Sequence, residues 1–85
     1  MSHYVYILQC GDGTLYTGYT NHLVHRFLMH LNGKGAKYTR GRTPLDLVYT
    51  ESYETKSEAM KREYRIKQMK RKEKERLIYG STKNH

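Results

Sequence analysis

The chain is 85 residues long, with a mass of 10.1 kDa, and 12% of its residues are aromatic. A chain this short forms one domain with a modest core, and its aromatic content argues against disorder. One cysteine, Cys10, and the lack of a long apolar run exclude an internal disulfide, a cysteine-based zinc cluster and a membrane span. We expect a cytoplasmic protein without a signal peptide.

The formal net charge is +8, and the basic residues are concentrated toward the C-terminus. Residues 56–85 contain eleven of the sixteen lysines and arginines but only four of the eight aspartates and glutamates. A basic segment on one side of a small domain favours a polyanionic partner, most often nucleic acid. The alternative interpretation is a solvated, charge-rich helix surface.

The N-terminal pattern predicts a β-hairpin. Residues 4–10 and 15–19 are rich in aromatic and β-branched residues, and Gly11-Asp12-Gly13 between them is typical of a tight turn. A loop centred on Asp12 pairs Leu8 with Tyr16 and Tyr6 with Gly18. Because strand side chains alternate between faces, this register places on one face Tyr4, Tyr6, Leu8 and Tyr16.

A helix is predicted over residues 22–32, with capping groups at Thr20-Asn21 and with Gly33 after its end. Its apolar positions recur at helical spacing and are expected to face the core; they are Leu23, Val24, Phe27, Leu28 and Leu31. Three polar side chains form a second stripe at intervals of four residues, namely His22, Arg26 and His30. This polar stripe is expected to point away from the core, where it is free for chemistry.

Residues 33–44 predict a basic loop, because they contain three glycines, Pro44 and several cations, with one helical turn near residues 36–40. Residues 45–53 then read as a third strand. The expected fold class is α+β, with a small three-stranded antiparallel sheet flanked by helices in the order β-β-α-β-α-α.

A second long helix is predicted over residues 56–69, where Thr55 and Glu58 match a capping box. Glu63 falls inside its apolar arc, and because burying an unpaired charge is costly, this carboxylate is expected to have a partner. A last short helix is predicted to end at Gly80. We therefore expect a single domain over residues 1–80 and a disordered tail over residues 81–85.

The polar features together suggest phosphodiester cleavage. A lone glutamate can hold a hydrated divalent cation, an arginine can stabilise a phosphate, and a tyrosine or histidine can orient or deprotonate water. Each residue alone has a simpler explanation: tyrosines pack in cores, and a polar helix stripe is usually solvated. The five histidines show no strong zinc-ligand spacing, and no phosphate-binding loop or dinucleotide fingerprint occurs.

The ordered set of motifs resembles the GIY-YIG nuclease superfamily over about residues 4–80, and most closely its short stand-alone bacterial YhbQ/YazA-like proteins. Tyr4-Val5-Tyr6 stands for the first family triplet and Tyr16-Thr17-Gly18 for the second. Arg26, His30 and the segment around Glu63 follow in the family order. The chain departs from the family pattern at Tyr4, which replaces glycine, and at Thr17, which replaces isoleucine, and it lacks a clear counterpart of a late asparagine.

The resemblance implies a role for each candidate residue. The candidate catalytic residues are Tyr6, Tyr16, Arg26 and His30, and the candidate metal ligand is Glu63, which would bind one Mg²⁺ or Mn²⁺. Arg26 would hold the scissile phosphate, Tyr16 would orient or activate water, and Tyr6 would serve as general base or hydrogen-bond partner. Cations and one aromatic residue would contact the substrate backbone; they are Lys37, Tyr38, Arg40, Arg42, Lys61, Lys67 and Lys70.

The implied activity is divalent-metal-dependent hydrolysis of phosphodiester bonds, with nucleic acid, most simply DNA, as partner. Two other interpretations remain open from the residues. One is a module of the same fold that binds nucleic acid without cutting it. The other is an adaptor whose basic helix meets a protein, although no large exposed apolar stripe supports it.

Overall fold

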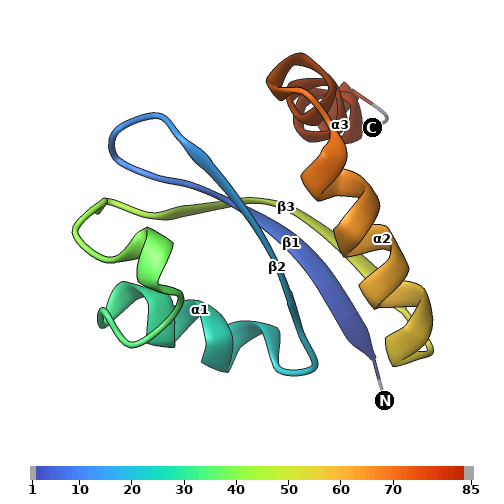
Figure 1. The fold of residues 1–85 in the computed structure, drawn as a ribbon, viewed down its shortest axis with the longest axis horizontal. Helices are drawn as coiled ribbons and strands as arrows, with labels where there is room; N and C mark the ends of the chain where they lie inside the picture. The colour runs from blue at the N-terminus through green and yellow to red at the C-terminus, as the bar shows by residue number, and fades with distance from the viewer. Residues whose placement is uncertain (1, 84–85) are drawn as a thin grey trace.

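The computed structural model describes residues 2–83 and contains a three-stranded sheet with helices on both faces (Figure 1). The elements in chain order are β1 (His3–Gln9), β2 (Leu15–Thr20), α1 (Leu23–Leu31), the 3₁₀ turn η1 (Lys37–Thr39), β3 (Asp46–Tyr53), α2 (Lys56–Gln68) and α3 (Arg71–Lys83). This order confirms the predicted α+β arrangement. No helix among the described residues is long and apolar enough to cross a membrane.

The sheet is antiparallel throughout, and β1 is its central strand, in the order β2-β1-β3. The hairpin register is the predicted one, with Tyr6 opposite Gly18 and Leu8 opposite Tyr16. Strand alternation therefore divides β1 into two sets of side chains. Val5 and Ile7 point to one face, and Tyr6 points to the other.

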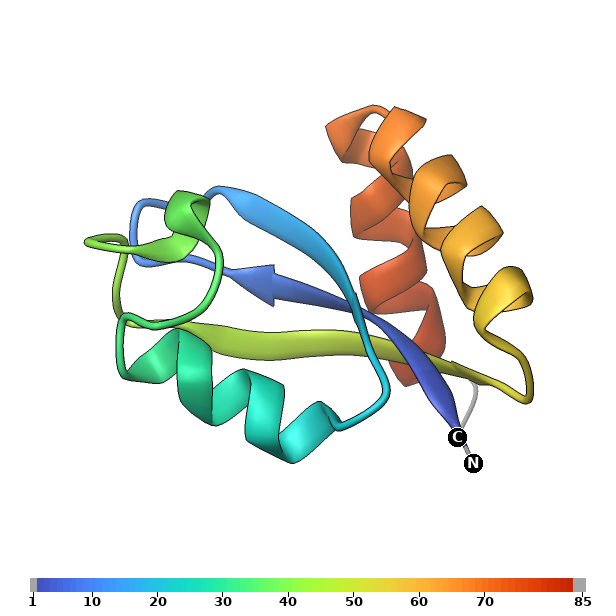
Figure 2. The same ribbon diagram turned by 60° about the horizontal axis from the view of Figure 1, so that its bottom comes forward.

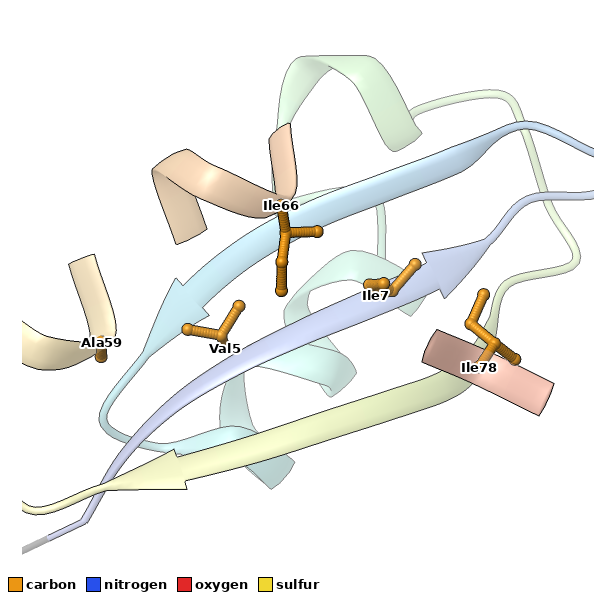
Figure 3. Packing of buried hydrophobic residues seen from close by; sticks show 5 residues of the cluster. All are labelled: Val5, Ile7, Ala59, Ile66 and Ile78. Atoms are coloured by element: carbon orange, nitrogen blue, oxygen red, sulfur yellow. The ribbon is translucent and has the colours of Figure 1, made fainter. Parts of the chain in front are cut away.

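The hydrophobic core lies between the sheet and the C-terminal helices (Figure 2). Val5 and Ile7 of β1 pack against Ala59 and Ile66 of α2 and Ile78 of α3, and all five are buried (Figure 3). The predicted cap of α2 is confirmed: Thr55 Oγ1 accepts a hydrogen bond from the Glu58 backbone N–H. Helix α2 is thus anchored to the sheet by a narrow apolar stripe, and most of its lysines and arginines are exposed to solvent.

Helix α1 packs on the other face of the sheet. The side of the helix that faces the sheet differs from the predicted apolar side. Val24 is 73% exposed, and Leu28 and Leu31 are also exposed, whereas His30 is 1% exposed. The expectation that the apolar stripe faces the core is therefore wrong for these three residues. The reason is that two hydrogen bonds satisfy the His30 ring, so this polar side chain can be buried at little cost.

Two helix ends also differ from the prediction. The N-cap of α1 is His22, and the Thr20 hydroxyl accepts from the His22 backbone N–H instead of capping the helix. At the other end of the chain, α3 continues past Gly80 to Lys83, so glycine does not terminate it. Residues 84–85 of the expected tail lie outside the described residues.

Thr17 is the one residue whose buried side-chain polar atom lacks a hydrogen-bond partner among the residues described. A buried hydroxyl without a partner loses its hydration and gains nothing in return. We expect Thr17→Val, which keeps the shape, to stabilise the fold by about 1 kcal/mol. Urea unfolding of both proteins measures the difference, and a destabilised valine variant would show that the hydroxyl has a partner such as bound water.

Candidate active site

The first feature of the site is a buried contact between β1 and α1. The Tyr6 hydroxyl lies 2.8 Å from His30 Nε2, and the two rings meet edge to face with centroids 5.8 Å apart. The Tyr6 ring lies over Gly18 of the neighbouring strand, where a Cβ would overlap the phenol oxygen. The glycine of the second triplet therefore makes room for the tyrosine of the first.

His30 is held from its other side by the basic loop. His30 Nδ1 lies 3.0 Å from Thr39 Oγ1, and that hydroxyl donates to the Ala36 carbonyl at 2.9 Å. Gly35 packs so closely against the ring that a Cβ there would overlap His30 Nδ1. The loop thus fixes the position of the imidazole through a close backbone approach and one hydroxyl.

An aromatic stack extends from the buried pair toward solvent. The Tyr16 ring lies edge to face with His30 at 5.5 Å between centroids, and Tyr38 stacks on Tyr16 at 5.8 Å. The Arg42 guanidinium lies 4.4 Å from the centroid of the Tyr38 ring and forms an ion pair with Asp12 in the hairpin turn. The loop side chains are therefore packed against the tyrosine of the second triplet.

Arg26 and burial act on the two titratable groups of the buried pair. Burial raises the pKa of the Tyr6 phenol, and a hydrogen bond from Arg26 acts in the opposite direction. Burial also lowers the pKa of His30, and the positive charge of Arg26 lowers it further. The imidazole is therefore neutral near pH 7 and the phenol keeps its proton.

Glu63 of α2 belongs to the same neighbourhood. Its side chain is 13% exposed and forms an ion pair with Lys67 at 3.4 Å, so the predicted partner of this carboxylate is a cation on its own helix. The negative charge of Glu63 also raises the pKa of Tyr6, which places the carboxylate within electrostatic range of the phenol. Helices α1 and α2 cover opposite faces of the sheet, so the carboxylate and His30 come from opposite sides of it (Figure 2).

The donor set fits a weakly coordinated hard cation. No group of three or more histidine, cysteine, aspartate or glutamate side chains that would hold a metal occurs among residues 2–83. The candidate ligand is Glu63, whose negative charge acts on the Tyr6 phenol. Mg²⁺ keeps several waters and is commonly held by one or two carboxylates plus substrate oxygens, whereas a structural zinc site needs four protein ligands.

The remaining candidate cations are divided between two surfaces. Lys37 and Arg40 are exposed on the loop beside Tyr38. Lys61 and Lys70 are exposed on α2 and directly after it, and Lys67 is the partner of Glu63. The loop cations are thus close to the stacked tyrosines. The other cations lie on the helix that carries the Glu63 carboxylate, or directly after it.

Sequence reasoning missed two residues that the site depends on. Thr39 bonds His30, and Asp12 holds Arg42. Neither carries a local signal, because each meets its partner only when the loop after α1 folds back on the helix or on the hairpin turn. Asp12 has one clue, since it is the only acidic residue among residues 1–45.

Comparison with known proteins gives one family. The model of the GIY-YIG catalytic domain matches residues 2–77. A UPF0213 protein of Oceanobacillus iheyensis is 63% identical over 89% of this chain and 88% of its own length. Another, of Halobacterium salinarum, is 60% identical over 89% of this chain and 99% of its own length.

Two solution NMR structures have the same fold. That of a UPF0213 protein from Bacillus halodurans is 53% identical, with a TM-score of 0.61, and the match covers 93% of this chain and 84% of that one. That of a protein from E. faecalis is 42% identical, with a TM-score of 0.68, and covers 100% of this chain and 91% of that one. The similarity therefore extends over nearly the whole length of the matched proteins.

Proposed function

The chain belongs to the GIY-YIG family, and from that premise we propose that it hydrolyses phosphodiester bonds in DNA with the help of one Mg²⁺ or Mn²⁺ ion. The observation that carries the proposal is the cluster of a buried Tyr6–His30 pair, Arg26 beside it and the Glu63 carboxylate within electrostatic range. A tyrosine, an arginine and a lone carboxylate at one place supply a proton acceptor, a phosphate ligand and a cation ligand.

Each side chain has a distinct task in this proposal. Arg26 binds the scissile phosphate and stabilises the negative charge that grows on it. Tyr16, at the edge of the aromatic stack, orients the attacking water, and Tyr6 accepts a proton from it. His30 lies behind Tyr6, where it assists that transfer without touching the substrate.

Glu63 is the proposed ligand of the divalent ion. When bound, such an ion neutralises phosphate charge and makes a coordinated water more acidic. The carboxylate must exchange its contact with Lys67 for the ion, and Lys67 is half exposed and long enough to turn toward a phosphate. The displaced lysine would then contact the substrate beside the residue that holds the ion.

The experiment that tests the proposal is a cleavage assay on several substrates. Single-stranded, duplex and branched DNA, and RNA, are incubated with the protein and Mg²⁺, Mn²⁺ or a chelator, with Tyr16→Phe in parallel. We expect metal-dependent cleavage that the phenylalanine variant loses while it stays folded. Binding without cleavage on every substrate would favour the non-cutting module of the same fold.

The Asp12–Arg42 pair gives a prediction about binding. Asp12 neutralises a cation that we assign to substrate phosphates, so Asp12→Asn should strengthen DNA binding. Both side chains are well exposed, and an exposed pair is worth at most about 1 kcal/mol, so the gain should not exceed about fivefold. A binding titration at several salt concentrations measures it, and the affinity of both proteins should fall steeply with salt.

The matched control is Asp46→Asn. Asp46 is exposed, and it forms none of the ion pairs that the structure shows within residues 2–83, so it tests the effect of net charge alone. Equal gains for the two variants would mean that Arg42 has no special role. An affinity that does not change between low and moderate salt would argue against phosphate contacts altogether.

A further inference from the structure

The hydrogen bonds around Thr39 determine which nitrogen of His30 carries the proton. Thr39 is 1% exposed, and its hydroxyl lies 2.9 Å from the Ala36 carbonyl and 3.0 Å from His30 Nδ1. A carbonyl oxygen only accepts, so the single hydroxyl hydrogen of Thr39 is donated to Ala36. Thr39 Oγ1 is then an acceptor toward the ring, and His30 Nδ1 must carry the hydrogen.

The other ring nitrogen follows from this assignment. A neutral imidazole has one N–H group, so Nε2 of His30 is an acceptor, and the Tyr6 hydroxyl at 2.8 Å donates to it. In the opposite tautomer, neither ring nitrogen would match its hydrogen-bond partner. Nδ1 would face the Thr39 oxygen without a hydrogen, and Nε2 would carry a hydrogen toward the Tyr6 hydroxyl. Nε2–H would compete with the Tyr6 proton, and Arg26, which also hydrogen-bonds the phenol, is a donor that cannot accept it.

From this geometry we infer that Thr39 is a positioning residue that holds His30 in the Nδ1–H tautomer and so makes His30 the acceptor of the Tyr6 proton during hydrolysis. The tautomer assignment stands on the hydrogen bonds alone. The part concerning hydrolysis rests on the proposed function. Thr39 touches no substrate in this scheme, since its hydroxyl is buried behind the imidazole.

The proton transfers balance as follows. Water loses a proton to the Tyr6 oxygen while the original Tyr6 proton moves to His30 Nε2, and the resulting hydroxide forms the new P–O bond. The P–O bond to the leaving oxygen breaks, and that oxygen takes a proton from solvent. His30 becomes an imidazolium with Nδ1–H still donated to Thr39, and it returns its proton to solvent after the products leave.

The charged and titratable groups that face His30 come from three elements. Tyr6 belongs to β1, Tyr16 to β2, and Arg26 to the same helix as His30. Arg26 opposes a positive charge on the imidazole in the free protein. Binding of a phosphate to Arg26 would offset that charge effect but not the larger effect of burial, so substrate makes the proton transfer less unfavourable.

The first test is the protonation pattern of the imidazole. Protein labelled with ¹⁵N-histidine is studied by NMR at neutral pH, and the His30 signals are identified by their loss in His30→Gln. We expect Nδ1 to be protonated in the natural protein and in Thr39→Ser, which keeps the hydroxyl. Thr39→Val removes it and should shift the ring toward the Nε2–H form.

The control is Thr17→Val, which makes the same substitution at a buried threonine on the core face of the sheet, opposite Ile7, and should leave the His30 signals unchanged. A natural protein with the proton on Nε2 would overturn the inference, as would an unchanged tautomer in Thr39→Val. If Thr39→Val does not fold, the natural protein and Thr39→Ser still decide the assignment.

The second test is the rate of cleavage. Thr39→Val should lower the turnover rate by about 100-fold or more with little change in DNA affinity, and Thr39→Ser should restore most of it. A shifted tautomer with an unchanged cleavage rate would show that Thr39 plays no part in hydrolysis. If the natural protein binds DNA but cuts nothing, the proposed function and the proton transfer both fail, and the NMR result alone judges the tautomer.

Discussion

Glu63→Gln should abolish metal-dependent cleavage and leave DNA binding intact or stronger. Glutamine keeps the shape of the side chain but removes the charge that attracts the cation. It also frees Lys67, the ion-pair partner at 3.4 Å, to contact phosphate. Loss of one electrostatic group of this kind typically costs about 100–1000-fold in rate. Cleavage rates, DNA affinity and Mn²⁺ binding measured on the same preparation check the three parts of the expectation.

Two further variants make this result specific. Arg26→Ala should impair both binding and cleavage, because it removes a phosphate contact as well as the group that stabilises the transition state. Glu54→Gln removes an exposed carboxylate between β3 and α2 and should change neither. Full activity in Glu63→Gln would exclude Glu63 as the metal ligand. Loss of DNA binding in that variant would instead indicate a structural role.

Much of the site follows from two local regularities in the sequence. The hairpin turn fixes which residues of β1 and β2 face each other, and strand alternation then places Tyr6 and Tyr16 on one face. The capping box fixes where α2 begins. Helical periodicity then places the Glu63 carboxylate among the apolar positions of the helix, where a charge is unusual. Each regularity acts within one hairpin or one helix, which is why both can be recognised without a structure.

The side of α1 that packs on the sheet was not predictable in the same way. An amphipathic stripe indicates which side chains prefer burial, but Val24 and Leu28 are exposed and His30 is buried. The orientation is accompanied by a pair of hydrogen bonds to Tyr6 and Thr39, which lie 24 and 9 residues away in the chain, outside the helix. No local pattern encodes such partners. The buried side of α1 can therefore differ from the side that its apolar periodicity indicates.

Glu51, on the core face of the sheet, is another polar residue whose burial depends on hydrogen-bond partners. Glu51 of β3 is 15% exposed and accepts from Arg62 Nε at 2.8 Å and Nη2 at 3.0 Å. The Tyr53 hydroxyl donates to it at 2.6 Å, and the Tyr49 hydroxyl donates to its other oxygen. Burial and this contact raise the pKa of Tyr49 to about 12. The cluster ties β3 to α2.

Arg62→Met should therefore destabilise the protein strongly. It leaves a largely buried carboxylate without its cation, and removing one partner of a fully buried pair costs about 3–5 kcal/mol. Since Arg62 is 26% exposed, we expect about 2 kcal/mol, which lowers the melting temperature by about 10 °C in a domain of this size. Urea unfolding at pH 7 measures the loss. The control is Arg71→Met in the exposed Arg71–Glu75 pair, which should cost less than about 0.5 kcal/mol.

The pH dependence separates this ion pair from simple packing. Burial alone would raise the pKa of Glu51, but the hydrogen bonds from Arg62, Tyr49 and Tyr53 outweigh it and lower the pKa below its ordinary value. A carboxyl with a lowered pKa in the folded state stabilises the fold above its unfolded pKa, and that contribution is lost as the pH falls through the folded value. The difference between the natural protein and Arg62→Met should thus be full above about pH 5 and shrink below pH 4, near and below the ordinary glutamate pKa. A difference that stays constant from pH 7 to pH 3 would mean that the arginine stem, and not its charge, stabilises the contact between β3 and α2.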